Sequence, residues 1–267
     1  MSKLITNPLI GADIEVFLMH KVSGEIVSAE GFVKGTKNEP FNFDPASKYF
    51  ATSLDNVLGE FCIPPATNKV NFIENIKKSL EYLNATIPDE LCTVSKPAAI
   101  LKDKYLQTEN AKLFGCEPDY CVWTRSINMK PEGVNPNLRS AGGHIHVGYD
   151  EPNRQEVAED IIKAMDLFIG IPSVIQEPDN DRKSLYGKAG CFRFKPYGVE
   201  YRTISNYYAG DERLTGWVYD NTQLAIDAVN NGLTFSKRLA DKIQLTINGN
   251  KKKAAEQLIK EFNLQLA

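Results

Sequence analysis

Two of the chain's three histidines lie two residues apart, in the stretch "SAGGHIHVGYD". His144 and His146 alternate with apolar residues, a spacing typical of a strand that sends both imidazoles to one face. Gly142, Gly143 and Gly148 flank them and let another backbone or a ligand approach closely. Paired imidazoles can bind a divalent metal, transfer protons or serve as buried polar groups. The stretch by itself leaves these three interpretations open.

Acidic residues show the same spacing in "GADIEVF", where Asp13 and Glu15 share one strand face while Ile14 and Val16 take the other. Two neighbouring carboxylates repel each other unless solvent or cations separate them. An exposed acidic face is the simpler interpretation of this pair, and a cation site is the alternative. Glu60, within the apolar context "VLGEFCI", adds a third acid that is weak evidence alone.

The segment "FRFKPYGVEYRTISN" carries the basic residues of interest. Arg193 and Lys195 share one strand face, as do Glu200 and Arg202. One interpretation is a cross-strand ladder of ion pairs, each of which contributes little at a surface. The other is that Glu200 binds a metal while the three basic side chains hold phosphate oxygens.

The segments say more together than separately. Carboxylates at Asp13, Glu15, Glu60 and Glu200, with the imidazole of His144, form a hard-ligand set that suits Mg²⁺ or Mn²⁺ better than structural Zn²⁺. The added basic residues indicate metal-bound phosphate. The chain contains neither a GxxxxGK[ST] phosphate loop nor a GxSxG nucleophile motif.

Hydrophobic patterns predict the elements that position these residues. Strands are predicted at residues 9–20, 21–27, 49–61 (two strands with a turn at Asp55–Asn56), around the two histidines, and at 190–204 (two strands joined near 196–198). Helices are predicted across residues 70–83, 153–170, 212–231 and 251–263. The segment 103–139 has no steady period and is predicted to be mostly loop, a candidate substrate-binding region. These elements lack a regular βαβ order, which predicts an α+β fold with a mainly antiparallel sheet and helices on one face.

Composition limits the function classes. The 267 residues are 42% hydrophobic and 24% charged, without repeats or a linker, which predicts one domain over residues 1–267. A net charge of -3 without a basic run predicts no nucleic-acid partner. No apolar stretch approaches the ~18 residues that span a membrane, and the first residues lack a signal peptide's apolar segment, so we expect a cytoplasmic protein. Five scattered cysteines without a CxxC pair predict reduced thiols.

The order of the motifs "GaDiEvF", "DNvlGEf..PPA", "GGHIHVG" and "R.KP.GvEYR" resembles the glutamine synthetase-like carboxylate–amine ligases, a group that includes the glutamate–cysteine ligases. It looks closest to the phage phiEco32-like COOH–NH2 ligase type 2 family. The resemblance spans roughly residues 9 to 206, with "FGCEPDY" as a further family-like stretch. It implies a glutamine synthetase-like catalytic domain with a curved, mainly antiparallel sheet, whose concave face holds ATP and two or three Mg²⁺ ions.

The resemblance also implies a ligand set for the metals. Asp13 would share one metal with His144 and Glu200, close to the nucleotide phosphates. Glu15 would hold another metal together with Glu60. Asp13 stands where better-known members carry glutamate, so its shorter side chain would place that metal deeper or bind it through water.

Catalytic and nucleotide-binding roles follow in the same way. Arg202 matches the arginine that stabilises the transferring phosphoryl group, two residues after the catalytic, metal-binding Glu200. His146 would lie beside the nucleotide or the acyl phosphate. Arg193 and Lys195 would bind phosphate or carboxylate.

The implied function is an ATP-dependent ligase that joins a carboxylate to an amine through an acyl phosphate. Its substrates would be small-molecule or peptide acids and amines, chosen by loops such as 103–139 and 176–190, in the host cytoplasm if the chain is phage-encoded. An oligomer is compatible with this. The alternatives are a metal-dependent hydrolase that uses His144, His146 and the acids around an activated water, and a non-catalytic nucleotide-binding module.

Overall fold

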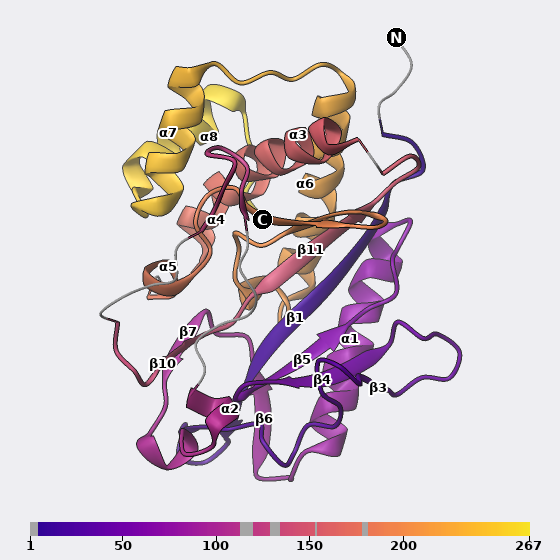
Figure 1. Ribbon diagram of the computed structural model, residues 1–267, viewed down its shortest axis with the longest axis vertical. Helices are drawn as coiled ribbons and strands as arrows, with labels where there is room; N and C mark the ends of the chain where they lie inside the picture. The colour runs from indigo at the N-terminus through magenta and orange to yellow at the C-terminus, as the bar shows by residue number, and fades with distance from the viewer. Residues whose placement is uncertain (1–4, 113–119, 129–133, 153, 178–180) are drawn as a thin grey trace.

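The computed structural model describes residues 5–112, 120–128, 134–152, 154–177 and 181–267 (Figure 1). Most of the family-like stretch "FGCEPDY", with Cys116, lies outside the described residues, as do parts of the segments 103–139 and 176–190. The described ranges contain no candidate for a membrane-spanning helix.

Most strands join one sheet, in the order β3-β4-β5-β1-β11-β13-β12-β8-β9, with β2 and β6 also paired to β1 and with β7 and β10 forming a separate ladder. Each strand ladder is antiparallel. The strands are β1 Leu9–His20, β2 Ile26–Val27, β3 Phe41–Asn42, β4 Ala51–Asp55, β5 Leu58–Cys62, β6 Leu91–Val94, β7 Ala98–Ile100, β8 Tyr120–Cys121, β9 Ser126–Ile127, β10 Leu138–Ser140, β11 Gly143–Gly148, β12 Cys191–Lys195 and β13 Gly198–Tyr201.

The helices are α1 Lys69–Thr86, α2 Glu109–Lys112, α3 Gln155–Met165, α4 Ile171–Gln176, α5 Arg182–Leu185, α6 Glu212–Asn230, α7 Lys237–Asn248 and α8 Lys252–Phe262. Short turns η1 Asp103–Tyr105 and η3 Asn206–Tyr208 are 3-10 helices, and η2 Asp166–Gly170 is a π-helical turn between α3 and α4. Helix α1 begins where the Asn68 side chain accepts a hydrogen bond from Asn71 N and ends before Pro88, as local capping rules require.

Strand β1 is the central strand of the site. Its first half pairs with β11 on one side and β5 on the other, and its second half pairs with β2 and β6. Its isoleucines and valine favour a strand, and Ile10, Ile14 and Val16 are fully buried. Because side chains alternate along a strand, Asp13 and Glu15 lie on the opposite face.

Helices α1, α3 and α6 cover the apolar face of the sheet (Figure 1). The core joins strand residues Ile14, Ile145 and Val199 to helix residues such as Ile76 and Ile161. The other face carries the acids and histidines. The structure therefore agrees with the predicted α+β class: a large antiparallel sheet with helices packed on one face.

Helices α4, α7 and α8 pack against one another (Figure 1). A second core lies between them and includes Ile171, Ile243 and Leu258. The sequence-based prediction missed α7, although Leu239, Ile243 and Ile247 recur at four-residue spacing along it. The predicted helix 153–170 was also too simple. It is α3 followed by the π-helical turn η2, and α4 continues from there.

Candidate active site

Sheet register brings the predicted residues together. Along β1, Asp13 lies opposite His144 of β11, and Glu15 lies opposite Glu60 of β5. On the next strand pair, His146 lies opposite Glu200 of β13. Residues from four segments far apart in the sequence therefore share one face of the sheet, because the strand alternation has the same phase at each of them.

Asp13, His146 and Glu200 form the first group, which we call the acid–histidine cluster. One ligand atom from each lies within 4.8 Å of the other two. His146 Nε2 lies 3.1 Å from Asp13 Oδ2. That nitrogen is buried and faces the Asp13 carboxylate. A ring nitrogen grouped with two carboxylates can bind a divalent metal.

His144 stands beside this cluster rather than in it. Its Nδ1 lies 2.8 Å from Asp13 Oδ1, 3.2 Å from Arg202 Nη1 and 3.5 Å from Glu200 Oε1. Burial and the Arg202 charge lower the pKa of His144, which favours a neutral ring. The resemblance implied Asp13, His144 and Glu200 as the ligands of one metal, and His144 Nδ1 does lie close to both acids. The structure also groups His146 with the same two acids, so the choice of the ligating histidine stays a prediction. The sequence could not distinguish the two histidines because both share a face.

Glu15, Asp55 and Glu60 form the second group, the carboxylate cluster, again with one oxygen from each within 4.8 Å of the others. Glu15 Oε2 accepts a 2.6 Å hydrogen bond from Gly142 N, and Glu60 Oε2 accepts one of 2.8 Å from Ser53 Oγ. The prediction paired only Glu15 with Glu60. Asp55 was assigned to a turn, yet it is the last residue of β4 and is nearly fully buried.

Electrostatics differ between the two clusters. Burial, then Asp55 and Glu60, raise the pKa of Glu15 well above its ordinary value. Burial, Asp13 and Asp55 raise the pKa of Glu60 to about 7. In the acid–histidine cluster, burial opposes ionisation but is outweighed. The two histidines hold the pKa of Asp13 well below its usual range, and Arg202 with the histidines lowers that of Glu200 to about 2.

The predicted basic residues surround Glu200. Arg202 Nη1 donates to Glu200 Oε1, and Lys195 Nζ lies 2.6 Å from Glu200 Oε2. Arg193 lies opposite Glu200 in the β12–β13 ladder, on the same face of the sheet. Glu200 is completely buried, so these cations offset the cost of removing its charge from water.

Two further basic residues that the sequence analysis missed hold the Arg202 backbone. Arg182 donates to the carbonyls of Thr203 (2.8 Å) and Arg202 (3.2 Å), and Lys183 donates to Thr203 O at 3.0 Å. Both side chains are buried, and burial lowers the pKa of Lys183 to about 8. Their local signal is only "DRKS", which resembles any exposed basic turn.

A buried carboxylate fixes the neighbouring part of the sheet. Asp166, at the start of η2, accepts hydrogen bonds from Trp123 Nε1 at 2.6 Å, Tyr201 Oη at 2.9 Å and Thr203 Oγ1 at 3.2 Å. Burial raises the pKa of Asp166 to about 6. The π-helical turn therefore anchors the chain on both sides of Arg202.

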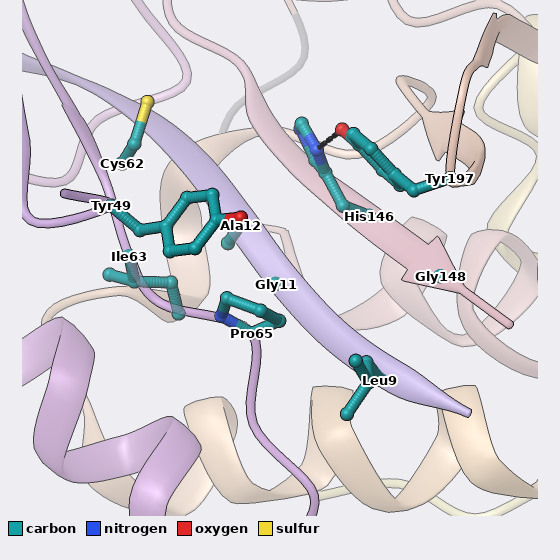
Figure 2. Close-up of a pocket in the computed structure, with 10 residues that line it drawn as sticks. All are labelled: Leu9, Gly11, Ala12, Tyr49, Cys62, Ile63, Pro65, His146, Gly148 and Tyr197. Carbon is teal, nitrogen blue, oxygen red and sulfur yellow. Dashed lines mark hydrogen bonds between the residues drawn. The ribbon is translucent and has the colours of Figure 1, made fainter. Parts of the chain in front are cut away.

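A pocket of about 320 Å³ opens beside His146. Figure 2 shows the rings of Tyr49 and Tyr197 on opposite sides of it, with Gly11 and Ala12 of β1 between them. Tyr197 Oη also hydrogen-bonds His146 Nδ1, and the two rings stack with centroids 5.9 Å apart. Neither tyrosine was singled out from the sequence; the proline–tyrosine–glycine turn between β12 and β13 was the available signal.

The glycines of "GGHIHVG" were expected to let another backbone or a ligand approach closely, and at two of them the protein's own atoms do so. A Cβ at Gly142 would overlap the His144 ring, and one at Gly143 would overlap the Ser205 carbonyl and the Tyr208 ring. These positions admit the protein's own atoms. A Cβ at Gly148 would meet nothing closer than 3.5 Å, at Tyr197 O.

The sequence profile of the family described as "Phage phiEco32-like COOH.NH2 ligase-type 2" matches residues 121–262, more than half of the chain. The chain belongs to this family. Membership supports a carboxylate–amine ligase, that is, a carbon–nitrogen bond-forming enzyme.

No protein with a curated description matches the chain. Solved structures do, among them "Crystal structure of a bifunctional glutathione synthetase from Pasteurella multocida", with a TM-score of 0.40 and 10% sequence identity. That match covers 96% of this chain and 49% of the other, so the chain spans about half the length of that structure.

Proposed function

We propose that this protein is an ATP-dependent carboxylate–amine ligase that forms an amide through an acyl phosphate. The observation that carries the proposal is the meeting of two acid clusters and the Arg202–Lys195 cations on one sheet face, beside a pocket. Such a face offers oxygen ligands for divalent cations and positive charge for phosphoryl oxygens. Family membership supports the amide-forming part of the reaction.

The residues present fit divalent cations. The carboxylate cluster holds three acids in a buried setting that raises the pKa of Glu15 and Glu60, so a cation would relieve their repulsion. The acid–histidine cluster directs the buried His146 Nε2 toward Asp13, with Glu200 in the same group. Oxygen-rich sites with at most one imidazole suit Mg²⁺ or Mn²⁺. When bound, such ions neutralise phosphoryl oxygens and polarise them.

The nucleotide would lie along the sheet from the pocket to the clusters. Its base would occupy the pocket beside His146, which the rings of Tyr49 and Tyr197 line from opposite sides. Its phosphates would then reach Lys195 and Arg193, while Arg202 stabilises the transferring phosphoryl group. Nearly buried in place, Arg202 needs little reorganisation as negative charge develops.

The chemistry follows from the poor leaving ability of a carboxylate oxygen. A substrate carboxylate oxygen attacks the γ-phosphorus of ATP, the bond to the β-phosphate oxygen breaks, and acyl phosphate and ADP form. The amine nitrogen then attacks the acyl carbon, phosphate leaves with the bonding electron pair, and the nitrogen loses a proton. The protein's part is positioning and charge stabilisation, as in other phosphoryl transfers.

We also propose that residues 1–267 form one catalytic domain with a glutamine synthetase-like fold. The support is the antiparallel sheet whose one face is covered by helices α1, α3 and α6 and whose other face carries the ligand set. Small-molecule or peptide acids and amines remain the proposed substrates.

Phosphate release tests this function. Protein with Mg²⁺, ATP and pooled acids should release phosphate faster when pooled amines are added. Glu200→Gln should lower the rate by about 10²–10³-fold, because it removes one charge from the reacting centre. Glu212→Gln, on the exposed start of α6, is the matched control and should leave the rate unchanged. Amine-independent cleavage of a substrate without ATP would indicate the hydrolase instead.

A further inference from the structure

The carboxylate cluster already has a cation against it. Lys37 Nζ lies 2.7 Å from Asp55 Oδ1, and its positive charge also lowers the pKa of Glu60, although burial and the neighbouring acids outweigh it. The Lys37 side chain is 43% exposed, whereas that of Asp55 is 3% exposed. Lys37 thus reaches from solvent to a buried carboxylate of this cluster. No motif in the sequence marks it.

The backbone that carries Lys37 is anchored, but the side chain is not enclosed. Leu54 N donates to Gly35 O at 3.0 Å, and Thr52 Oγ1 donates to Lys34 O at 3.0 Å, which ties the segment to β4. A turn follows, with Thr36 N donating to Glu39 O at 3.0 Å. A long, flexible ammonium on a fixed backbone can leave Asp55 without refolding its segment.

A divalent cation and the Lys37 ammonium compete for the same oxygens. A metal held by Glu15, Asp55 and Glu60 would place two positive charges next to the Lys37 charge, at a distance where like charges repel strongly at a protein surface. Of Lys37 and Asp55, the lysine side chain is the one exposed to solvent. A bound metal would therefore displace the lysine.

We propose that Lys37 sets the divalent-cation affinity of the carboxylate cluster: its ammonium pairs with Asp55 in the metal-free protein and is displaced when the metal binds. This inference rests on the metal-binding part of the proposed function and not on ATP use or on the amide-forming step. Without metal, the Lys37 ammonium offsets part of the negative charge of the carboxylate cluster. A metal must break this ion pair to bind, so the same interaction weakens metal binding.

Mn²⁺ binding tests it, with free Mn²⁺ followed by electron paramagnetic resonance. Asp55→Asn identifies the binding class that belongs to the carboxylate cluster. In Lys37→Met, this class should bind Mn²⁺ roughly three- to tenfold more tightly, the size expected for removal of a partly exposed ion pair. Lys37→Arg keeps the charge and should behave as wild type. Lys34→Met, on the same segment but over the Phe41 ring, should also leave binding unchanged.

A second measurement uses the unmodified chain and so does not depend on how a variant folds. Acetylation of lysines, mapped by peptide mass spectrometry, should increase severalfold at Lys37 when Mn²⁺ is added and stay constant at Lys34. Equal or weaker Mn²⁺ binding in folded Lys37→Met, or unchanged acetylation of Lys37 while Mn²⁺ binds, overturns the inference alone. Absence of any Mn²⁺ binding to the wild type contradicts the proposed metal sites as well.

Discussion

The hydrogen bond between Tyr197 and His146 decides which ring nitrogen faces the acids. With Nδ1 engaged by Tyr197 Oη, Nε2 is directed toward Asp13 and Glu200. Partners of this kind fix the tautomer and orientation of a ligating histidine, and their loss commonly costs 10–100-fold in metal affinity. Tyr197 lies in the turn between β12 and β13, so the orientation of His146 depends on that turn.

Tyr197→Phe should therefore weaken Mn²⁺ binding about 10–100-fold at the acid–histidine cluster while leaving the fold unchanged. Titration of Mn²⁺ with circular dichroism of the same samples measures both. Tyr49 lines the same pocket from the other side, so Tyr49→Phe is the control and should bind Mn²⁺ as the wild type does. Equal affinities for the two variants would show that Tyr197 does not orient His146.

At this scale the sequence predicted which residues share a face, but not their partners. Alternation along single strands places Asp13 with Glu15 and His144 with His146, and this is local information. How His144 and His146 are oriented toward Asp13 and Glu200 depends on rotamers across three strands. The placement of Asp55 and Lys37 at the carboxylate cluster depends on how the turns around β4 fold. No local sequence pattern therefore marks these two residues.

Strand β11 illustrates the element scale, because its glycines fit the protein rather than a ligand. Gly142→Ala should lower the free energy of unfolding by about 1–3 kcal/mol, since the new methyl overlaps the His144 ring and forces it to move. Gly148→Ala has ordinary contact distances and should change it by less than about 0.5 kcal/mol. Urea unfolding measures both, and similar losses for the two would contradict this packing.

The π-helical turn η2 is a second element whose role is structural support. Asp166→Asn replaces a carboxylate that accepts three hydrogen bonds, and we expect a loss of about 1–3 kcal/mol in unfolding free energy. Asp160→Asn on α3, 45% exposed, is the control and should be near neutral. A neutral Asp166→Asn would mean that the buried carboxylate does not anchor β13.

Elements with strong local signals were predicted well: β1, the β4–β5 and β12–β13 pairs, α1, α6 and α8. Sheet order and the π-helical turn could not be predicted, because they depend on contacts between distant segments. The missed α7 had a readable apolar spacing at Leu239, Ile243 and Ile247. The roles assigned to the site residues stay predictions.

For the whole molecule, the carboxylate cluster makes the free energy of unfolding depend on pH and on divalent metal. Glu60 has a folded pKa of about 7 against an ordinary 4.5, so the folded protein retains a proton that the unfolded chain loses. Stability from this group is therefore present below about pH 4.5 and is lost as the pH rises through about 7.

Relative to wild type, metal-free Glu60→Gln should gain unfolding free energy as the pH rises from 5 to 8, by up to about 3 kcal/mol. At pH 8, saturating Mg²⁺ should make the wild type more stable than Glu60→Gln, because the metal stabilises only the protein with all three carboxylates. Denaturant unfolding at both pH values, with Mg²⁺ or with a chelator, measures the four differences. A pH-independent difference would contradict the buried, repelling arrangement of these acids.

The most direct test of the central claim is mass spectrometry of the product. Wild-type protein is incubated with Mg²⁺, ATP and pooled acids and amines, in parallel with Glu200→Gln and with a sample that lacks ATP. Our account predicts a new amide, equal in mass to one acid plus one amine minus water. It should form in the complete wild-type reaction and not in the sample that lacks ATP. The same amide formed equally without ATP, or equally by Glu200→Gln, would contradict it.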